Sequence, residues 1–372
     1  MNQLQIDIPH FLKHDWQQQP RLFKGAFTDF DDPISPDELA GLALEDGAAA
    51  RMIHTKADHW LAQDGAPEDY SPLGDNNWQL LVQAINHFVD DGQQLARQFR
   101  FLPDWRFDDL MASFAVEGGG VGPHIDNYDV FIIQGQGKRH WQVGDRGDHP
   151  KRADNSNMSL VADFEPIIDM VMEPGDLLYI PVGFPHCGRS LVPSLSYSVG
   201  FRAPSQQELL SALADVLVDN NLGEQRYQQA DDNPQPSQIS TEQQQGFAAL
   251  VSATLNGDGW QQALGCALSQ NRFELALEPQ AIDAEQLLQA LQAGAQLQRT
   301  PGVKCLQVQD DRQTRLFIDG QIWVLPSDLS AQAAQLAQSD QLSWPQLAPL
   351  CQQQNALAEL LSWVQQGYWY LD

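Results

Sequence analysis

Residues 118–131 of this chain read GGGVGPHIDNYDVF and contain the triplet His124-Ile125-Asp126. β-Branched and aromatic residues surround the triplet, which predicts strands on both sides of it. Residues i and i+2 of a strand face the same side, so the His124 imidazole and the Asp126 carboxylate are expected to point into one cavity. These are two of the three ligands of a 2-His-1-carboxylate site, which holds Fe(II) and leaves positions open. The third ligand must then be a histidine from elsewhere.

The triplet alone is a weak signal, because nine histidines and 49 acidic residues in 372 produce roughly one H-x-[DE] match by chance. Its context is more specific. Residues 173–186 read EPGDLLYIPVGFPH, which predicts a Pro-Gly-Asp turn, a strand over residues 177–180 and a bend that ends at His186. A strand-borne H-x-D followed by such a histidine is typical of the cupin barrel, a closed double-stranded β-helix or jelly roll. His124, Asp126 and His186 are the predicted metal ligands and catalytic residues.

Several runs carry a resemblance to a known family: ISPDELAGLA at residues 34–43, WRFDDLM at 105–111, GGGVGPHIDNYDVFIIQGQGKRHWQVG at 118–144, EPGDLLYIPVGFPH at 173–186 and YSVGFRAPS at 197–205. They resemble the JmjC-type ribosomal oxygenases of the cupin-4 group, which include bacterial arginine hydroxylases of a large-subunit ribosomal protein. The resemblance is close over about residues 1–205 and looser beyond. At the end of the chain, GYWYLD at residues 367–372 looks like the family's terminal strand.

The resemblance implies an enzyme that uses Fe(II), 2-oxoglutarate and O2 to hydroxylate an arginine of a basic ribosomal protein, giving 3-hydroxyarginine, succinate and carbon dioxide. Other classes stay open. A related JmjC histidine hydroxylase or demethylase would use the same three ligands, and only the substrate pocket would differ. A non-enzymatic metal-binding cupin would not need a cation for the co-substrate. A small-molecule cupin isomerase would have no use for the appended C-terminal part of the chain.

A dicarboxylate co-substrate needs a cation at its far end. In the family this cation is a Lys or Arg that lies two residues before a tryptophan of the strand. Here that residue is Arg139. By alternation, Lys138 and His140 are expected to face the other side of the strand. Ser113, on the strand before the metal loop, is expected to add a hydroxyl. The alternative interpretations are a surface arginine and an ordinary strand serine. Related enzymes carry a second serine where this chain has Ala115, so the co-substrate contact set is incompletely defined.

The glycines at residues 118–120 and 122 predict a loop where substrate or backbone approaches closely. The loop lacks the Lys-Ser/Thr of a phosphate-binding loop. Two nearby residues are not assigned to the site. His149 falls in a polar segment that predicts an exposed loop, and Cys187 would face away from the cavity of His186. A catalytic Cys-His pair would lack an orienting partner.

The first hundred residues predict an α/β layer that covers the barrel. Ser35 and Pro36 are typical of a helix start. A second apolar repeat at helical spacing predicts a helix over residues 78–88 and consists of Trp78, Leu81, Ile85 and Phe88. Five histidines lack an acidic partner at H-x-[DE] spacing and are interpreted as structural: His10, His14, His54, His59 and His87.

The composition changes after Pro204, because residues 206–372 contain no histidine and only six Lys or Arg. Helices are expected over residues 208–217 and 246–255. A helix over residues 284–293 is then followed by strands at 303–309, 314–318 and 321–325 and by helices from Asp328. We expect an α+β chain with three parts: a catalytic domain over residues 1–205, a helical region over 206–272 that the resemblance makes a dimerisation element, and a winged-helix-like domain over 273–372. Simple packing within one chain is the alternative for the helical region.

The formal net charge is −28, which argues against direct nucleic-acid binding because phosphate contacts require clustered cations. A basic protein partner fits this charge, and solubility alone is the alternative explanation. No apolar run approaches 18 residues, and the N-terminus lacks the features of a signal peptide. Four widely spaced cysteines predict neither disulfides nor a zinc site. The expected location is the cytoplasm, without membrane attachment, and the expected assembly is a homodimer.

Overall fold

The computed structural model describes residues 2–56, 59–152, 158–228, 236–308 and 313–372, which form two compact units. The first unit contains the residues up to Ala203 together with the short segments Asn271–Leu277 and Thr300–Gly302. The second contains Pro204–Gln270, Glu278–Arg299 and Val303–Asp372. The three-part division expected from the sequence stays a prediction.

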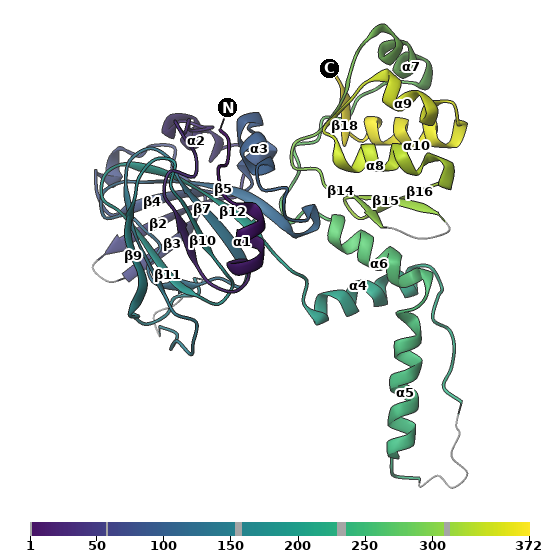
Figure 1. The fold of residues 1–372 in the computed structure, drawn as a ribbon, viewed down its shortest axis with the longest axis horizontal. Coiled ribbons are helices and arrows are strands. Elements are labelled where there is room, and N and C mark those ends of the chain that lie inside the picture. Colours follow the sequence, from purple (N-terminus) through teal and green to yellow (C-terminus); the bar gives the residue numbers. More distant parts are fainter. Residues whose placement is uncertain (1, 57–58, 153–157, 229–235, 309–312) are drawn as a thin grey trace. The chain divides into compact units, whose positions relative to one another are not determined.

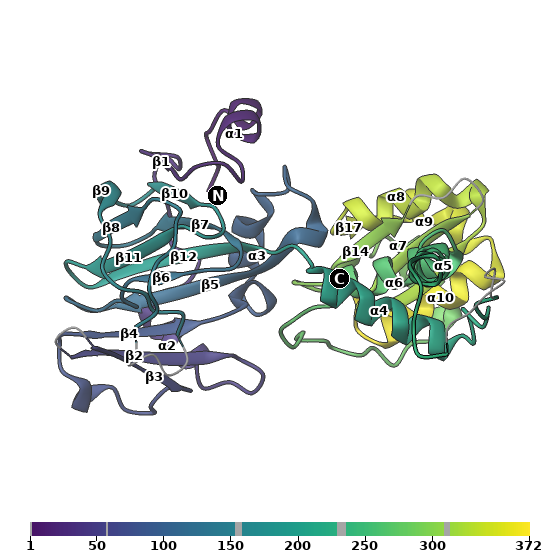
Figure 2. The same ribbon diagram turned by 90° about the horizontal axis from the view of Figure 1, so that it is seen from below.

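The first unit is a barrel of two antiparallel sheets (Figure 2). The larger sheet has the strand order β1-β10-β7-β12-β5-β4-β2-β3 and the smaller one β6-β11-β8-β9. The strands of the larger sheet are β1 (Arg21–Phe23), β2 (Ala50–Lys56), β3 (His59–Asp64), β4 (Trp78–Val82), β5 (Phe107–Ala115), β7 (Asp129–Gln134), β10 (Leu177–Ile180) and β12 (Ser194–Phe201). Those of the smaller sheet are β6 (His124–Ile125), β8 (Arg139–Gly144), β9 (Pro166–Met172) and β11 (Pro185–Ser190). The predicted double-stranded β-helix is therefore confirmed.

Strand β7 shows why the central strands are apolar on both faces, since all six of its residues are buried. Phe131 and Ile133 join the core beneath α1 (Ile8–His14), α2 (Pro36–Leu42) and α3 (Asp90–Arg97), the helices that cover the larger sheet (Figure 1). Val130 and Ile132 face the other way and pack with Trp141 of β8 inside the barrel. The interior of the barrel, between the two sheets, thus contains an apolar cluster of its own.

The N-terminal prediction is confirmed for one helix and wrong for another. The Ser35 hydroxyl accepts from the Glu38 backbone N–H at the start of α2, and the Glu38 carboxylate accepts from the Ser35 backbone N–H, which completes a capping box. The helix expected over residues 78–88 does not exist: Trp78–Val82 is strand β4, and Ile85–His87 is a 3-10 turn. Pairing with β2 on one side and β5 on the other outweighs the helical spacing of four apolar residues. Strands β2 to β4 consequently extend the barrel's own sheet.

The second unit combines helices with two small sheets (Figure 1). Its helices are α4 (Gln206–Asp219), α5 (Thr241–Thr254), α6 (Asp258–Ser269), α7 (Ala284–Ala293), α8 (Ser330–Gln338), α9 (Trp344–Cys351) and α10 (Gln354–Gln365). One sheet has the order β14-β15-β16 and the other β17-β13-β18. The strands are β13 (Leu297–Arg299), β14 (Cys305–Val308), β15 (Thr314–Ile318), β16 (Gln321–Leu325), β17 (Gln341–Leu342) and β18 (Trp369–Leu371).

The hairpin between β15 and β16 turns at Asp319 and Gly320, whose φ values of 45° and 78° match the predicted tight turn. Both strands have the predicted bounds. The preceding strand, expected over residues 303–309, begins at Cys305 instead of Val303, and Gln309 lies outside the described residues. Across the parts of the chain that the structure describes, no helix has the length and apolar character needed to cross a membrane.

Candidate metal centre

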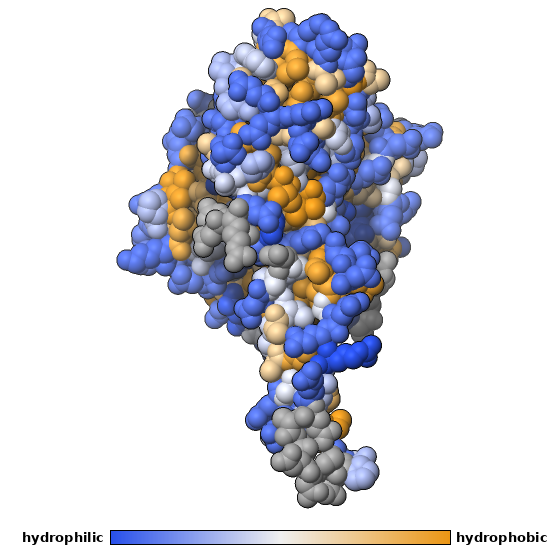
Figure 3. Space-filling view, turned by 90° about the vertical axis from the view of Figure 1, so that its right-hand side faces the viewer, coloured by the Kyte–Doolittle hydropathy of each residue, from blue (hydrophilic) through white to orange (hydrophobic). Residues whose placement is uncertain are grey.

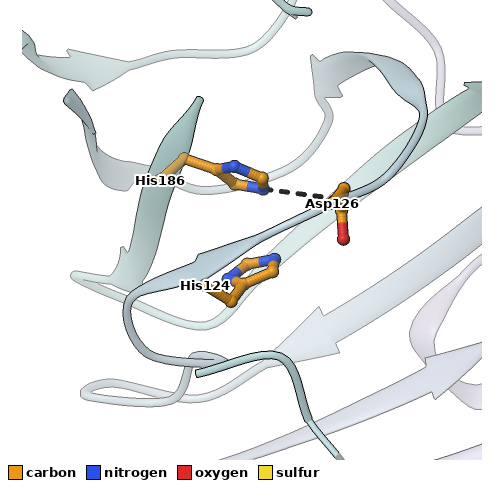
Figure 4. Close-up of side chains that lie close together, drawn as sticks. All are labelled: His124, Asp126 and His186. Atoms are coloured by element: carbon orange, nitrogen blue, oxygen red, sulfur yellow. Dashed lines mark ion pairs between the residues drawn. The ribbon is translucent and has the colours of Figure 1, made fainter. Parts of the chain in front are cut away.

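His124, Asp126 and His186 come together inside the barrel, with one potential ligand atom of each within 4.8 Å of the others (Figure 4). His124 lies on β6, Asp126 follows that strand directly, and His186 lies opposite His124 in the register of β6 and β11. The two imidazole centroids are 4.1 Å apart, and His186 Nε2 is 3.6 Å from Asp126 Oδ2. Two imidazoles and one carboxylate form the donor set of a facial 2-His-1-carboxylate site.

Both imidazoles are oriented by their Nδ1 atoms. Nδ1 of His124 donates to the Gly122 carbonyl oxygen at 2.8 Å, and Nδ1 of His186 donates to that of Phe184 at 3.1 Å. These bonds assign the proton to Nδ1 and leave the Nε2 lone pairs free for a metal. Burial lowers the pKa of His186 to about 4, so its ring is neutral and able to coordinate at physiological pH.

Two glycines of the run before His124 lie where the backbone of another segment approaches so closely that a side chain would not fit. A Cβ on Gly119 would collide with the carbonyl oxygen of Trp78, and one on Gly120 would collide with that of Gly188. The run is held to β11, because the backbone N–H of Gly118 donates to the Ser190 carbonyl at 2.8 Å. The sequence predicted that either substrate or backbone approaches these glycines closely. For Gly119 and Gly120 the structure shows that backbone does.

Gly122 has a different neighbour, the indole ring of Trp60 on β3. Its φ of +87° lies in the left-handed region, and a Cβ there would meet three ring carbons at 2.5 to 2.7 Å. Arg152 stacks on the same indole at 5.4 Å from the ring centroid. Trp60 therefore packs on the peptide whose carbonyl orients His124.

Arg139 is buried in the same barrel, with 3% of its surface exposed. Its guanidinium donates four hydrogen bonds, to the hydroxyl and carbonyl oxygens of Ser113 and of Ser194, at 2.8 to 3.1 Å. Within the described residues no carboxylate contacts it. Burial lowers the pKa of Arg139 to about 9, which still leaves the group protonated at neutral pH. A buried cation with neutral partners is a site for an anion.

The sequence analysis did not assign Ser194 and Ser196 to the site, although an alternating pattern in their strand indicates which residues face the barrel interior. In β12 the small polar residues Ser194, Ser196 and Ser198 alternate with the apolar Leu195, Tyr197 and Val199. Leu195, Tyr197 and Val199 belong to the core beneath the helices. The serines therefore face the barrel interior. There Ser196 Oγ lies 3.0 Å from Ser113 Oγ.

A cavity of about 260 Å³ joins the metal centre to Arg139 and is lined by His124, Asp126, His186, Arg139 and Ser113 among others. Trp141 also lines it, and its buried indole N–H has no hydrogen-bond partner among the residues that the structure describes. The His124, Asp126 and His186 side chains, a guanidinium that no described carboxylate contacts and the indole N–H of Trp141 together fit a divalent metal with a bound 2-oxo dicarboxylate.

Two of the histidines not assigned to the site bond to backbone carbonyls elsewhere, and Cys187 follows His186 on β11. Nε2 of His149 bonds to the Asp145 carbonyl at 2.9 Å on the surface, and Nδ1 of His87 bonds to that of Glu274 at 2.8 Å. Burial raises the pKa of the Cys187 thiol to about 11, so it carries no thiolate at neutral pH. The protonated thiol is a poor nucleophile, which argues against the Cys-His alternative.

Comparisons with known proteins fit the geometry of this site. A JmjC domain matches residues 94–209, and a ROXA-like winged helix matches residues 255–370. The ribosomal protein uL16 3-hydroxylase of Escherichia coli (strain K12) is 39% identical over 375 residues, which cover 100% of this chain and 99% of the relative. The chain belongs to the JmjC-type ribosomal oxygenases. The predicted family, barrel and winged helix are thereby confirmed.

Solved structures of this ribosomal oxygenase family cover the whole chain. The E. coli ribosomal oxygenase YcfD in complex with cobalt and 2-oxoglutarate aligns with a TM-score of 0.92 and 38% identity, over 100% of both chains. The same protein in complex with cobalt and succinic acid aligns with the same score, identity and coverage. The first of these ligands is the 2-oxo dicarboxylate expected from the sequence, and the second is its decarboxylated product.

Proposed function

We propose that this chain is an Fe(II)- and 2-oxoglutarate-dependent hydroxylase of the large-subunit ribosomal protein uL16, and that the modified residue is an arginine, converted to 3-hydroxyarginine. The observation that carries the proposal is the pairing of two features in one cavity. The 2-His-1-carboxylate set offers a metal site, and Arg139, a buried cation that contacts no carboxylate of the described residues, offers a carboxylate site. A cupin that only binds metal has no use for the second feature.

In this proposal His124, Asp126 and His186 hold Fe(II) on one side and leave its remaining positions to ligands. Arg139 binds the far carboxylate of 2-oxoglutarate, and Ser113 positions the guanidinium through its hydroxyl and carbonyl oxygens. When bound, iron and 2-oxoglutarate supply O2 activation coupled to oxidative decarboxylation. The apolar residues beneath the cavity keep water from the reacting groups.

Charge supports a basic ribosomal protein as the substrate. The chain carries 49 acidic residues against 21 Lys and Arg. A negative surface raises the encounter rate with a positively charged protein, and it disfavours contact with the phosphates of ribosomal RNA. We place the reaction in the cytoplasm, a reducing compartment that agrees with four free cysteines.

The test is to incubate the purified protein with Fe(II), 2-oxoglutarate, O2 and overlapping uL16 peptides, and to measure peptide masses. We expect a gain of one oxygen atom on a peptide that contains an arginine, located by fragmentation. The same peptide with lysine in place of that arginine should gain nothing. An oxygen on histidine, or loss of a methyl group, would instead identify the related hydroxylase or demethylase. Absence of 2-oxoglutarate turnover with every peptide would support the binding-only cupin.

We also propose that the helical region forms a homodimer with a second copy of the chain. Several large apolar side chains of α4 and α5 are exposed, including Leu210 (54%), Val218 (76%), Phe247 (44%) and Val251 (58%). Apolar surface interrupts the polar surface on the face of the molecule shown in Figure 3. Exposed apolar side chains on these two helices suit an interface between protein chains.

A further inference from the structure

Gln79 of strand β4 is a buried polar residue without a described partner. It is 4% exposed and lines the cavity that holds the metal residues and Arg139. Across the parts of the chain that the structure describes, no hydrogen bond to its side-chain amide is formed. An amide that lines a cavity and makes no hydrogen bond to the described residues has its donors and acceptor available to a ligand in that cavity.

The strand register places Gln79 near the Arg139 end of this cavity. Gln79 pairs with Ala115 of β5, and Ala115 pairs on its other side with Ser194 of β12. Ser194 is one of the two serines that hold the Arg139 guanidinium. Gln79, Ala115 and Ser194 therefore form one row across the sheet, at the level of the cation.

Arg139 alone cannot satisfy a carboxylate in this position. A guanidinium has five N–H donors, and four hydrogen bonds already connect that of Arg139 to Ser113 and Ser194. A carboxylate offers roughly four acceptor positions. Arg139 has one N–H left, so further donors come from the rest of the cavity wall, where Trp141 offers its indole N–H and Ala115 offers no polar side chain. The amide of Gln79 has two N–H donors and lies in the adjacent strand.

We propose that the Gln79 amide donates a hydrogen bond to the far carboxylate of 2-oxoglutarate, and so replaces the donor that Ala115 lacks. This inference rests on the proposed function. It assigns a second binding residue for the co-substrate on a strand that sequence patterns did not connect with the site. Glutamine has a longer side chain than serine. This length suits a donor that starts from the adjacent strand β4 instead of from position 115 on β5.

The test compares Gln79→Ala with the unchanged chain, both full-length and loaded with Co(II), by isothermal titration calorimetry. A hydrogen bond to a charged group corresponds to roughly 10- to 100-fold in affinity, so the variant is expected to bind 2-oxoglutarate at least about 10-fold more weakly. The affinity for 2-oxopentanoate, which carries a methyl group in place of the far carboxylate, should not change. Adding Ala115→Ser to the variant should restore much of the lost affinity.

Gln83→Ala is the matched control, because Gln83 lines the same cavity but lies beyond the end of β4. It should leave 2-oxoglutarate affinity unchanged. Equal 2-oxoglutarate affinities for Gln79→Ala and the unchanged chain would overturn the inference, and so would an equal loss for 2-oxoglutarate and 2-oxopentanoate. If the unchanged chain itself fails to bind 2-oxoglutarate, the proposed function fails as well.

Discussion

Replacing Gly122 by alanine tests how the metal loop is built. The new Cβ would meet three ring carbons of Trp60 at 2.5 to 2.7 Å, on a backbone whose φ is +87°. The same peptide provides the carbonyl that accepts the Nδ1 proton of His124. The substitution therefore strains the backbone, displaces the indole and disturbs the orientation of a metal ligand.

Gly65→Ala is the control that separates backbone strain from the clash with Trp60. The φ of Gly65 is +84°, and a Cβ there would meet nothing within 4 Å. Both substitutions carry the left-handed backbone cost of about 1–2 kcal/mol. Only Gly122→Ala adds overpacking, of about 1–3 kcal/mol. Its total destabilisation is expected to be about 2–5 kcal/mol. In a Trp60→Ala background the extra cost should disappear, which a double-mutant cycle would show as coupling between the two sites.

Stability is measured by urea denaturation of the metal-free protein, and metal affinity by calorimetric titration with Co(II). Loss of an outer contact of a metal ligand typically weakens binding about 10- to 100-fold, which we expect for Gly122→Ala but not for Gly65→Ala. If both variants lose the same stability and bind Co(II) equally well, then Trp60 does not hold the loop, and the reasoning is refuted.

Four further predictions concern the ligands, the cation, pH and assembly. Asp126→Ala should abolish turnover. It should also weaken iron binding by more than roughly 100-fold, the upper loss typical when a residue that only hydrogen-bonds to a metal ligand is replaced. Full activity in that variant would exclude Asp126 as a ligand. Arg139→Lys keeps the charge but loses the planar fork, so 2-oxoglutarate should bind about 10- to 100-fold more weakly in calorimetry while Co(II) affinity is retained. Burial lowers the folded-state pKa of His186 from 6.5 to about 4, so the unfolded chain binds more protons between these values. The metal-free protein should therefore lose stability as pH falls from 6.5 to 4, by up to about 3 kcal/mol, and His186→Gln should show less of this dependence in urea titrations. Val251→Asp places a charge on the exposed face of α5, and sedimentation should show dissociation of the dimer at unchanged helix content; an unaltered mass would exclude this interface.

Local patterns in the sequence were sufficient for many single elements. The apolar run at Leu177–Ile180 after a Pro-Gly-Asp turn, the hairpin around Asp319-Gly320 and the helix Ala284–Ala293 all have the predicted bounds. These features depend on residues within one turn or one strand, where side-chain period and turn chemistry suffice. The three metal-site residues were found in the same way, because His124 and Asp126 are two residues apart and His186 follows a recognisable turn and strand.

The segment Trp78–Val82 shows where such patterns fail. Its apolar residues fit a helical period, but β2 and β5 provide strand partners on both sides. Leu80 and Val82 then face the core beneath the helices, while Gln79 and Leu81 face the cavity. The choice between helix and strand was made by partners far away in the chain, which a single-sequence period does not contain.

The sequence by itself determined the family, the barrel and the residue types available for a metal and an anion. Only the tertiary structure decided which groups surround them: the serines that hold Arg139, the indole that packs on Gly122, and the unused amide of Gln79. These groups come from segments that are distant in the chain, and the register of the sheets brings them to one cavity wall or loop. Register depends on the packing of both faces of every strand at once, so it is a property of the folded barrel as a whole.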